Sequence, residues 1–467
     1  MPDAALPAEL GHVLASANAF ERRYLEIGDL DALDEAVDAW EQILTHPAVA
    51  TRPADVRAAV LNNAAGLLLQ RYWARGHNAD LDAAVRRLHE AVTESAERGP
   101  VLAGRLTNLG LALRERYQSG GQLHDLQVAI EAFAQAIDEA GKGYSDRPRL
   151  LNNLGLGLTD QYLHTGLLAE LERAIAALQE AVDAHPVGSL DWAGSLSNLS
   201  NALRYRYKRT GRLQDLDRAI DGYEAALAAT AQGSPERPSR RLSNLGNGLR
   251  DRYARTGNAQ DLDRAIEVYE QAVAEIPAGS PDRPGCLTNL GDGLRDRFAR
   301  TGEVDDLERA IAALQEAVTT APTTSPDRPR WLSNLGAGVR DRFALTGNIE
   351  DLDGAVAAFE QALAGIPGGA PDHPAVLNNL GDTLRDRYNR TGEPDDLDRA
   401  IRAYRDVITE LDPGSPDWPG RVANLANALR DRYVRTGSGE ILDQAIGVVQ
   451  PSGGEGVDRV IGPGALP

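Results

Sequence analysis

The chain repeats a pattern of residues about every 45 positions. An aromatic residue recurs at intervals of 45 to 48 residues, and each one is followed by a glycine four residues later, a leucine nine later and an alanine twelve later. The aromatic positions are Tyr24, Tyr72, Tyr117, Tyr162, Tyr207, Tyr253, Phe298, Phe343, Tyr388 and Tyr433. A period of 20 to 50 residues is typical of stacked structural repeats. The spacing therefore predicts an array of ten units.

Composition limits the partners of such an array. A chain of 467 residues suggests about three domains by length alone, but an unbroken period favours one continuous stack in which each repeat contacts its neighbours. The formal net charge of −20 argues against nucleic acid and against an anionic membrane as the partner. The partner is expected to be a protein or a peptide.

The sequence has no recognisable catalytic or cofactor motif. Its single cysteine, Cys286, cannot form an intramolecular disulfide, and its eight histidines fall at unrelated positions of the repeat. No Walker-type loop or serine elbow occurs, and the glycine pairs such as Gly246-x-Gly248 lie in helical patterns without a preceding strand. Without a secretory signal or a long apolar run, we expect a cytoplasmic protein that is not an enzyme and needs no cofactor or metal.

Residues 280–322 show how one repeat is built. Ser280 is the expected N-cap of a first helix, and Gly302 is placed to end it in a left-handed conformation. Asp305 or Asp306 is the expected cap of a second helix, which Pro322 ends. Apolar or small residues are spaced at three and four positions along the first helix, at Leu287, Leu290, Gly291, Leu294 and Phe298. The predicted fold is all-α, a solenoid of about ten antiparallel helix pairs with no strands.

The repeat resembles a known family. Leu242-x-x-Leu245-Gly246-x-x-Leu249, then Ala265-x-x-x-Tyr269 and Pro277, follows the pattern of the tetratricopeptide (TPR) repeat, with two leucines in place of its aromatics. A TPR unit has about 34 residues, whereas this unit has 45, with a longer pair of helices. Repeats of this length resemble the TPR arms associated with CHAT caspase-like peptidases of bacteria and fungi. The resemblance implies a TPR-like superhelix and a concave groove that binds a peptide.

The ends of the array differ from its middle. Residues 1–450 are predicted to form the ten repeats, of which the first two and the last diverge from the others. Divergence is expected of terminal repeats because one of their faces has no neighbouring repeat. Residues 451–467 are rich in glycine and proline and are predicted to be a disordered tail or linker.

Two polar registers recur on the predicted first helices: an asparagine, and an Arg-Asp pair six and seven residues after it. In TPR proteins this side of the first helix lines the groove, so the resemblance implies that these residues contact a ligand. A second interpretation is a ladder in which the arginine of one repeat pairs with the aspartate of the next. Identical residues in consecutive repeats favour the ladder. The candidate groove residues are Asn244, Asn247, Arg250, Asp251, Asn289, Asp292, Arg295, Asp296, Asn334, Arg340, Asp341, Asn379, Asp382, Arg385, Asp386, Asn424, Arg430 and Asp431.

Three functions are compatible with these observations. The first, which we favour, is a non-catalytic scaffold or adaptor that binds a protein or peptide in its groove, such as the sensor or regulatory arm of a CHAT peptidase system. The second is a structural array that associates with other copies end to end through its C-terminal repeat. The third is an enzyme or small-molecule receptor with a pocket inside the superhelix, for which the sequence offers no motif.

Overall fold

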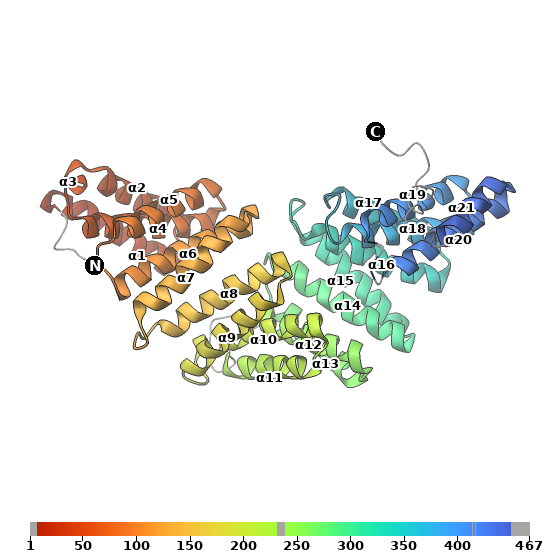
Figure 1. Cartoon of the computed structure of the whole chain (residues 1–467), viewed down its shortest axis with the longest axis horizontal. Coiled ribbons are helices and arrows are strands. Elements are labelled where there is room, and N and C mark those ends of the chain that lie inside the picture. The colour runs from red at the N-terminus through yellow and green to blue at the C-terminus, as the bar shows by residue number, and fades with distance from the viewer. Residues whose placement is uncertain (1–6, 231–238, 413, 416, 450–467) are drawn as a thin grey trace. The chain divides into compact units, whose positions relative to one another are not determined.

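The computed structural model describes residues 7–230, 239–412, 414–415 and 417–449 (Figure 1). In these ranges every regular element is a helix, and the helices form ten antiparallel hairpins in succession. The all-α solenoid predicted from the 45-residue period is therefore confirmed. The chain divides into two compact units, Met1–Glu236 and Arg237–Pro467, each of which contains five hairpins.

The first unit begins with a short 3-10 helix, Ala8–Leu10, and continues with eleven α-helices. One of them, α3, has only four residues and lies between the first two hairpins, where the repeat interval is longest at 48 residues. The helices are α1 (Gly11–Ile27), α2 (Leu30–Thr45), α3 (Pro47–Ala50), α4 (Ala54–Arg75), α5 (Asn78–Glu94), α6 (Pro100–Gly120), α7 (Leu123–Ala140), α8 (Arg147–Thr165), α9 (Leu168–Ala184), α10 (Leu190–Thr210) and α11 (Leu213–Thr230).

The second unit consists of five hairpins of similar length. Its helices are α12 (Ser239–Thr256), α13 (Ala259–Glu275), α14 (Arg283–Thr301), α15 (Val304–Thr320), α16 (Arg328–Thr346), α17 (Ile349–Ala364), α18 (His373–Thr391), α19 (Pro394–Glu410), α20 (Trp418–Thr436) and α21 (Gly439–Val449). The predicted array over residues 1–450 spans both units and stays a prediction as a single domain. The predicted tail at 451–467 lies outside the described residues.

The periodic glycine ends each first helix, as the sequence predicted. Gly302 adopts φ 75° and ψ 8°, a left-handed conformation that costs least for a residue without a Cβ atom. Its backbone N–H donates to the carbonyl of Phe298, the periodic aromatic residue, at 2.7 Å. The glycine thus satisfies a carbonyl at the helix end and turns the chain into the second helix.

The predicted helix starts need correction. The N-cap position of α14 is Asp282 rather than Ser280, and Pro284 occupies its first turn. The N-cap position of α15 is Glu303, so neither Asp305 nor Asp306 caps that helix. Asp306 lies instead in the first turn and is buried, because it pairs with an arginine of the first helix.

Close contact inside a hairpin depends on a glycine of the first helix. A Cβ atom added at Gly246 would lie 2.4 Å from Cε1 of the buried Tyr269, so no larger residue fits unless the ring moves. The periodic leucine and alanine of the second helix, Leu262 and Ala265, are fully buried. These positions explain why small and branched apolar residues dominate the repeat.

Within each unit, each hairpin packs on the next chiefly through its second helix, which lies against the following first helix. A second helix such as α13 packs against the next first helix, α14, and consecutive first helices such as α12 and α14 also touch. The first helices therefore form a continuous row in which polar side chains of neighbouring repeats can meet. Consecutive second helices meet through long polar side chains, as where Arg309 of α15 pairs with Glu270 of α13.

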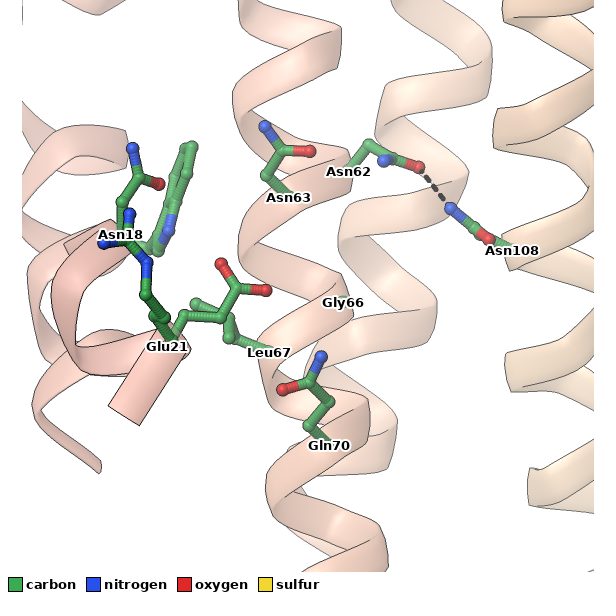
Figure 2. Close-up of a pocket in the computed structure, with 10 residues that line it drawn as sticks. Asn18, Glu21, Asn62, Asn63, Gly66, Leu67, Gln70 and Asn108 are labelled. Carbon is green, nitrogen blue, oxygen red and sulfur yellow. Dashed lines mark hydrogen bonds between the residues drawn. The ribbon is translucent and has the colours of Figure 1, made fainter. Parts of the chain in front are cut away.

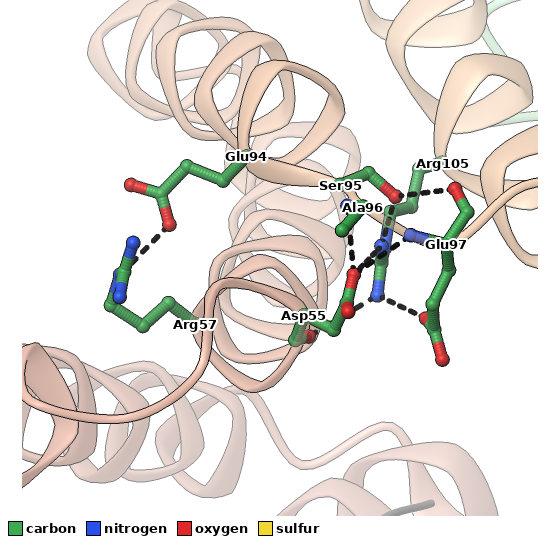
Figure 3. A network of polar contacts seen from close by, with 7 residues as sticks. All are labelled: Asp55, Arg57, Glu94, Ser95, Ala96, Glu97 and Arg105. Carbon is green, nitrogen blue, oxygen red and sulfur yellow. Dashed lines mark hydrogen bonds and ion pairs between the residues drawn. The ribbon is translucent and has the colours of Figure 1, made fainter.

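Polar contacts also fix the loop between hairpins. Arg105 of α6 is 5% exposed and donates to Ser95 Oγ, the Asp55 carbonyl and Glu97 Oε2 (Figure 3). Asp55 Oδ1 accepts from the backbone N–H groups of Ala96 and Glu97 at 2.9 and 3.0 Å. The loop between the second and third hairpins is thus held by side chains from both of them.

Candidate binding surface

The Arg-Asp register of the second unit forms a ladder. Each arginine reaches the aspartate of the following repeat rather than its own neighbour in sequence, which lies about 100° away around the helix. The contacts are Arg250 Nε to Asp296 Oδ2 at 2.5 Å, Arg295 Nη2 to Asp341 Oδ2 at 2.7 Å, Arg340 Nε to Asp386 Oδ2 at 2.8 Å and Arg385 Nε to Asp431 Oδ2 at 2.7 Å. In the described residues of the first unit, Arg114 makes the same kind of contact with Asp160 at 2.6 Å. The structure therefore has the pairing that the ladder interpretation predicts.

The ladder leaves little unpaired charge along its length. Its arginine and aspartate side chains are between 18% and 39% exposed, so each pair is partly screened by solvent. Asp251 stands at the start of this row on α12, and Arg430 stands at its end on α20. Arg430 is 62% exposed and lies 3.5 Å from Asp431, which already accepts from Arg385. Arg430 is therefore the most accessible arginine of the register in the second unit.

The asparagine register is only partly used for stacking. Some repeats carry two adjacent asparagines. The register asparagine of the following repeat then donates its side-chain amide to the first of the two. The pairs are Asn108 with Asn62, Asn198 with Asn152 and Asn424 with Asn378, at 2.9 to 3.0 Å. Asn334 instead donates to both carboxylate oxygens of Asp292, at 3.1 and 3.2 Å. In the described residues, the amides of Asn244, Asn289 and Asn379 are half-buried and have no such bond.

Two further candidates belong to the hairpin interior. Tyr269 donates its hydroxyl to Asn247 at 2.8 Å, and Tyr404 donates to Asp382 at 2.7 Å. Burial, helped by Asp382, raises the pKa of Tyr404, so this hydroxyl keeps its proton and remains a donor. Asn247 and Asp382 therefore hold the two helices of a hairpin together.

Asp292 occupies the same position of its repeat as Asn247 and Asp382. It faces Leu314, which cannot donate a hydrogen bond. Burial raises its pKa, although Arg250 at 3.5 Å and Arg295 act in the opposite direction. Its partners are Asn334 and Arg250, on the first helices of the neighbouring repeats on either side. Asp292 therefore joins three consecutive hairpins.

A second arginine of the repeat was not singled out by the sequence analysis. Two residues after the ladder arginine, it donates from Nε and Nη2 to an aspartate nine residues later, at the start of the second helix. In the part of the chain that the structure describes, seven repeats contain this pair: Arg71–Asp80, Arg116–Asp125, Arg206–Asp215, Arg252–Asp261, Arg297–Asp306, Arg342–Asp351 and Arg387–Asp396. We call it the hairpin clamp. The recurrence of both residues at constant spacing was the signal that could have revealed it.

The clamp arginine also reaches the preceding hairpin. Arg387 donates to Asp353 of α17 at 2.8 Å, and Arg206 donates to Glu172 of α9 at 2.7 Å. Paired aspartates such as Asp396 are only 6% exposed. The clamp therefore fixes the angle within one hairpin and the stacking of two.

A polar cleft of about 480 Å³ lies on the first-helix row of the first unit (Figure 2). Five of its ten lining residues carry amide side chains, and these come from three consecutive first helices, α1, α4 and α6. The lining is Asn18, Glu21, Arg22, Trp40, Asn62, Asn63, Gly66, Leu67, Gln70 and Asn108. The groove residues predicted from the sequence lie between Asn244 and Asp431 and do not include this lining, because the first two repeats diverge from the repeated pattern.

Comparison with known proteins identifies the repeat. Residues 192–233, on α10 and α11, and residues 240–282, on α12 and α13, match the tetratricopeptide repeat family. The chain carries tetratricopeptide repeats. The resemblance inferred from Leu242 to Pro277 is therefore confirmed for the family, with one matched TPR hairpin in each unit.

Several solved structures are similar to this TPR chain. Human IFIT1, described as a dimer with PPP-AAAA, is 14% identical, and the match covers 95% of this chain and 90% of IFIT1 with a TM-score of 0.48. PilF of Pseudomonas aeruginosa is 16% identical over 62% of this chain and 100% of its own, with a TM-score of 0.41. YrrB, described as a TPR protein with an unusual peptide-binding site, is 18% identical over 53% of this chain and 97% of its own, with a TM-score of 0.32. No curated protein matches the sequence significantly.

Within the described ranges, no group of three or more histidine, cysteine or acidic residues is placed to hold a metal ion. No helix there has the length and apolar character needed to cross a membrane. Cys286 is buried beside Ser243, at 3.4 Å, and burial raises the pKa of its thiol, which makes it a poor nucleophile.

Proposed function

We propose that this TPR chain is a non-catalytic scaffold that binds a protein segment or peptide along its row of first helices. TPR arrays bind protein and peptide partners, and the observation that carries the proposal here is the amide-lined cleft of the first unit. An extended peptide presents backbone N–H and C=O groups at short intervals. An amide side chain offers both a donor and an acceptor, so a row of amides can bind such a backbone whatever its sequence.

The second unit offers a more limited binding surface of its own. Its ladder arginines and aspartates are paired with one another, whereas the half-buried amides of Asn289 and Asn379 are not engaged in the described part of the chain. We propose that these amides and the exposed Arg430 contact a segment bound to this unit, and that the ladder keeps its repeats in register. The CHAT association and end-to-end assembly stay predictions.

A glycine offers a direct test of the cleft. Gly66 lines it, and a Cβ atom added there would meet nothing within 4 Å, so the backbone position of Gly66→Leu has room for a side chain that extends into the cleft. Gly104 on α6 is exposed and equally unobstructed, so Gly104→Leu is the matched control. Both changes favour the helix by up to about 1 kcal/mol, so neither should harm folding.

The readout is binding of the full chain to immobilised nine-residue peptides of degenerate sequence. We expect the unmodified chain and Gly104→Leu to retain peptide equally, and Gly66→Leu to lose at least about tenfold in affinity, the effect of about 1.4 kcal/mol. Retention that is the same for all three proteins would contradict the proposal, as would absence of retention by the unmodified chain.

A further inference from the structure

The cleft of the first unit lies between two repeats that lack the arginine–aspartate contact of the ladder. In the first repeat, Glu21 stands three residues before the periodic Tyr24, the position that Arg340 occupies before Phe343. In the second repeat, Gln70 stands at the position that is aspartate in the ladder. At each step of the ladder, or rung, an arginine faces a carboxylate of the following repeat. Between the first two repeats, the same positions hold a carboxylate and an amide.

Glu21 is left without a charged partner. It is half-buried on α1 and extends toward α4 between Asn63 and Gln70 (Figure 2). Burial raises the pKa of its carboxyl, and no neighbouring cation in the described part of the chain compensates. A short distance away, Gln70 Oε1 is buried without a hydrogen-bond donor in the described residues. The cleft therefore contains acceptors that lack donors.

Unmet acceptors of this kind are costly unless a ligand supplies the donors. A lysine ammonium has three N–H donors and an arginine guanidinium has five, and either would neutralise a carboxylate. In the second unit, the equivalent contact is made by an arginine of the chain itself, as between Arg340 and Asp386. At this position of the second unit the chain therefore supplies its own cation, whereas in the first repeat Glu21 supplies a carboxylate.

We propose that the cleft takes a lysine or arginine side chain of the bound peptide, whose cationic group lies between Glu21 and Gln70 and completes the missing rung. This inference rests on the proposed function and adds the chemical class of the ligand. The net charge of −20 favours the approach of a basic segment. The remaining amides, such as Asn18, are then available to the peptide backbone on either side.

Arg22 is the other charged residue that lines the cleft, and it provides the alternative hypothesis that the cleft binds an acidic ligand. It follows Glu21 in sequence, and its side chain is exposed, whereas Glu21 is half-buried. If Arg22 governed recognition, the cleft would select an acidic peptide. The more deeply placed carboxylate favours the basic one, since an interaction is screened less where solvent is excluded.

The test uses nine-residue peptides with one fixed central residue and degenerate flanking positions, bound to the full chain. For the unmodified chain we expect central lysine and arginine to bind about tenfold more tightly than central glutamine or norleucine. Glu21→Gln keeps the side-chain shape and should abolish this preference, so that peptides with the four central residues bind with similar affinity. Glu26→Gln, on the exposed face of the same helix, should behave as the unmodified chain.

The outcomes separate this inference from the function on which it rests. Peptide binding that Gly66→Leu removes, without any preference for a basic centre, would overturn the basic-residue inference and leave the scaffold intact. A preference for central aspartate or glutamate that Arg22→Gln removes would overturn it in favour of an acidic ligand. Absence of Gly66-dependent binding would overturn both.

Discussion

Arg340 of α16 donates to Asp386 of α18 at 2.8 Å, across an interval of 46 residues. Its immediate neighbour in sequence, Asp341, accepts instead from Arg295 of the preceding repeat. One repeat therefore presents its arginine to the following hairpin and its aspartate to the preceding one. The Arg-Asp pair works as a two-sided connector, which explains why it recurs with a constant spacing.

Removal of a ladder arginine should weaken stacking by a small amount. Arg340→Ala is expected to lower the free energy of unfolding by about 0.5–1 kcal/mol, because both partners are about one-third exposed. A double-mutant cycle with Asp386→Ala, followed by urea denaturation, measures the coupling directly. Arg390→Ala, at an exposed position of α18, is the control and should be neutral. A coupling of zero would show that the contact does not stabilise the stack.

Removal of a clamp arginine should cost more. Arg297→Ala leaves the buried Asp306 carboxylate without its two hydrogen bonds of 2.7 and 2.6 Å and is expected to cost about 3 kcal/mol. Gln161 stands at the same position in the fourth repeat, where no aspartate follows nine residues later. Gln161→Ala should therefore change stability by no more than about 0.5 kcal/mol. Equal losses for the two variants would contradict the role of the clamp.

The last repeat lacks the clamp and can be given one. Its arginine, Arg432, has Ile441 at the partner position, and Arg432 Nε is buried without a hydrogen bond among the described residues. Ile441→Asp is expected to restore the pair and to increase hydrogen-exchange protection of α21, with added benefit from an acid in the first turn of a helix. Ile441→Asn has the shape of the aspartate variant without its charge and should give less hydrogen-exchange protection of α21 than Ile441→Asp. Protection that falls in Ile441→Asp relative to the parent would show that the apolar contact of Ile441 matters more.

Glu21 should make stability depend on pH. The pKa of its carboxyl is raised above the ordinary 4.5, so the folded chain keeps a proton that the unfolded chain releases. Stability therefore falls as pH rises from 4.5 through the raised pKa, and charged Glu21 is destabilising at neutral pH. Glu21→Gln is expected to raise the free energy of unfolding at pH 7 and to have little effect at pH 4. An equal gain at both pH values in denaturant titrations would argue against burial of the charge.

The sequence alone determined the architecture because each repeat encodes its own hairpin. The period of 45 residues, the glycine at Gly302 and the apolar spacing from Leu287 to Phe298 are local signals, and a hairpin is a local structure. Local signals were less reliable at helix starts. Asp306 suits an N-cap by residue type, yet its tertiary partner Arg297 draws it into the first turn as a buried ion pair.

Only the tertiary structure decided which polar residues are already paired. On one helix, Asn247 and Arg250 look equally available, but Asn247 accepts from Tyr269 of its own hairpin and Arg250 binds Asp296 of the next. Those partners lie 22 and 46 residues away, and helix spacing within one repeat does not specify which of them a side chain reaches. The cleft could not be predicted from the sequence for the same reason. Glu21 and Gln70 depart from the repeat, and the departure acquires meaning only when stacking places both in the lining of one cleft, at the position that the second unit closes with an arginine and an aspartate.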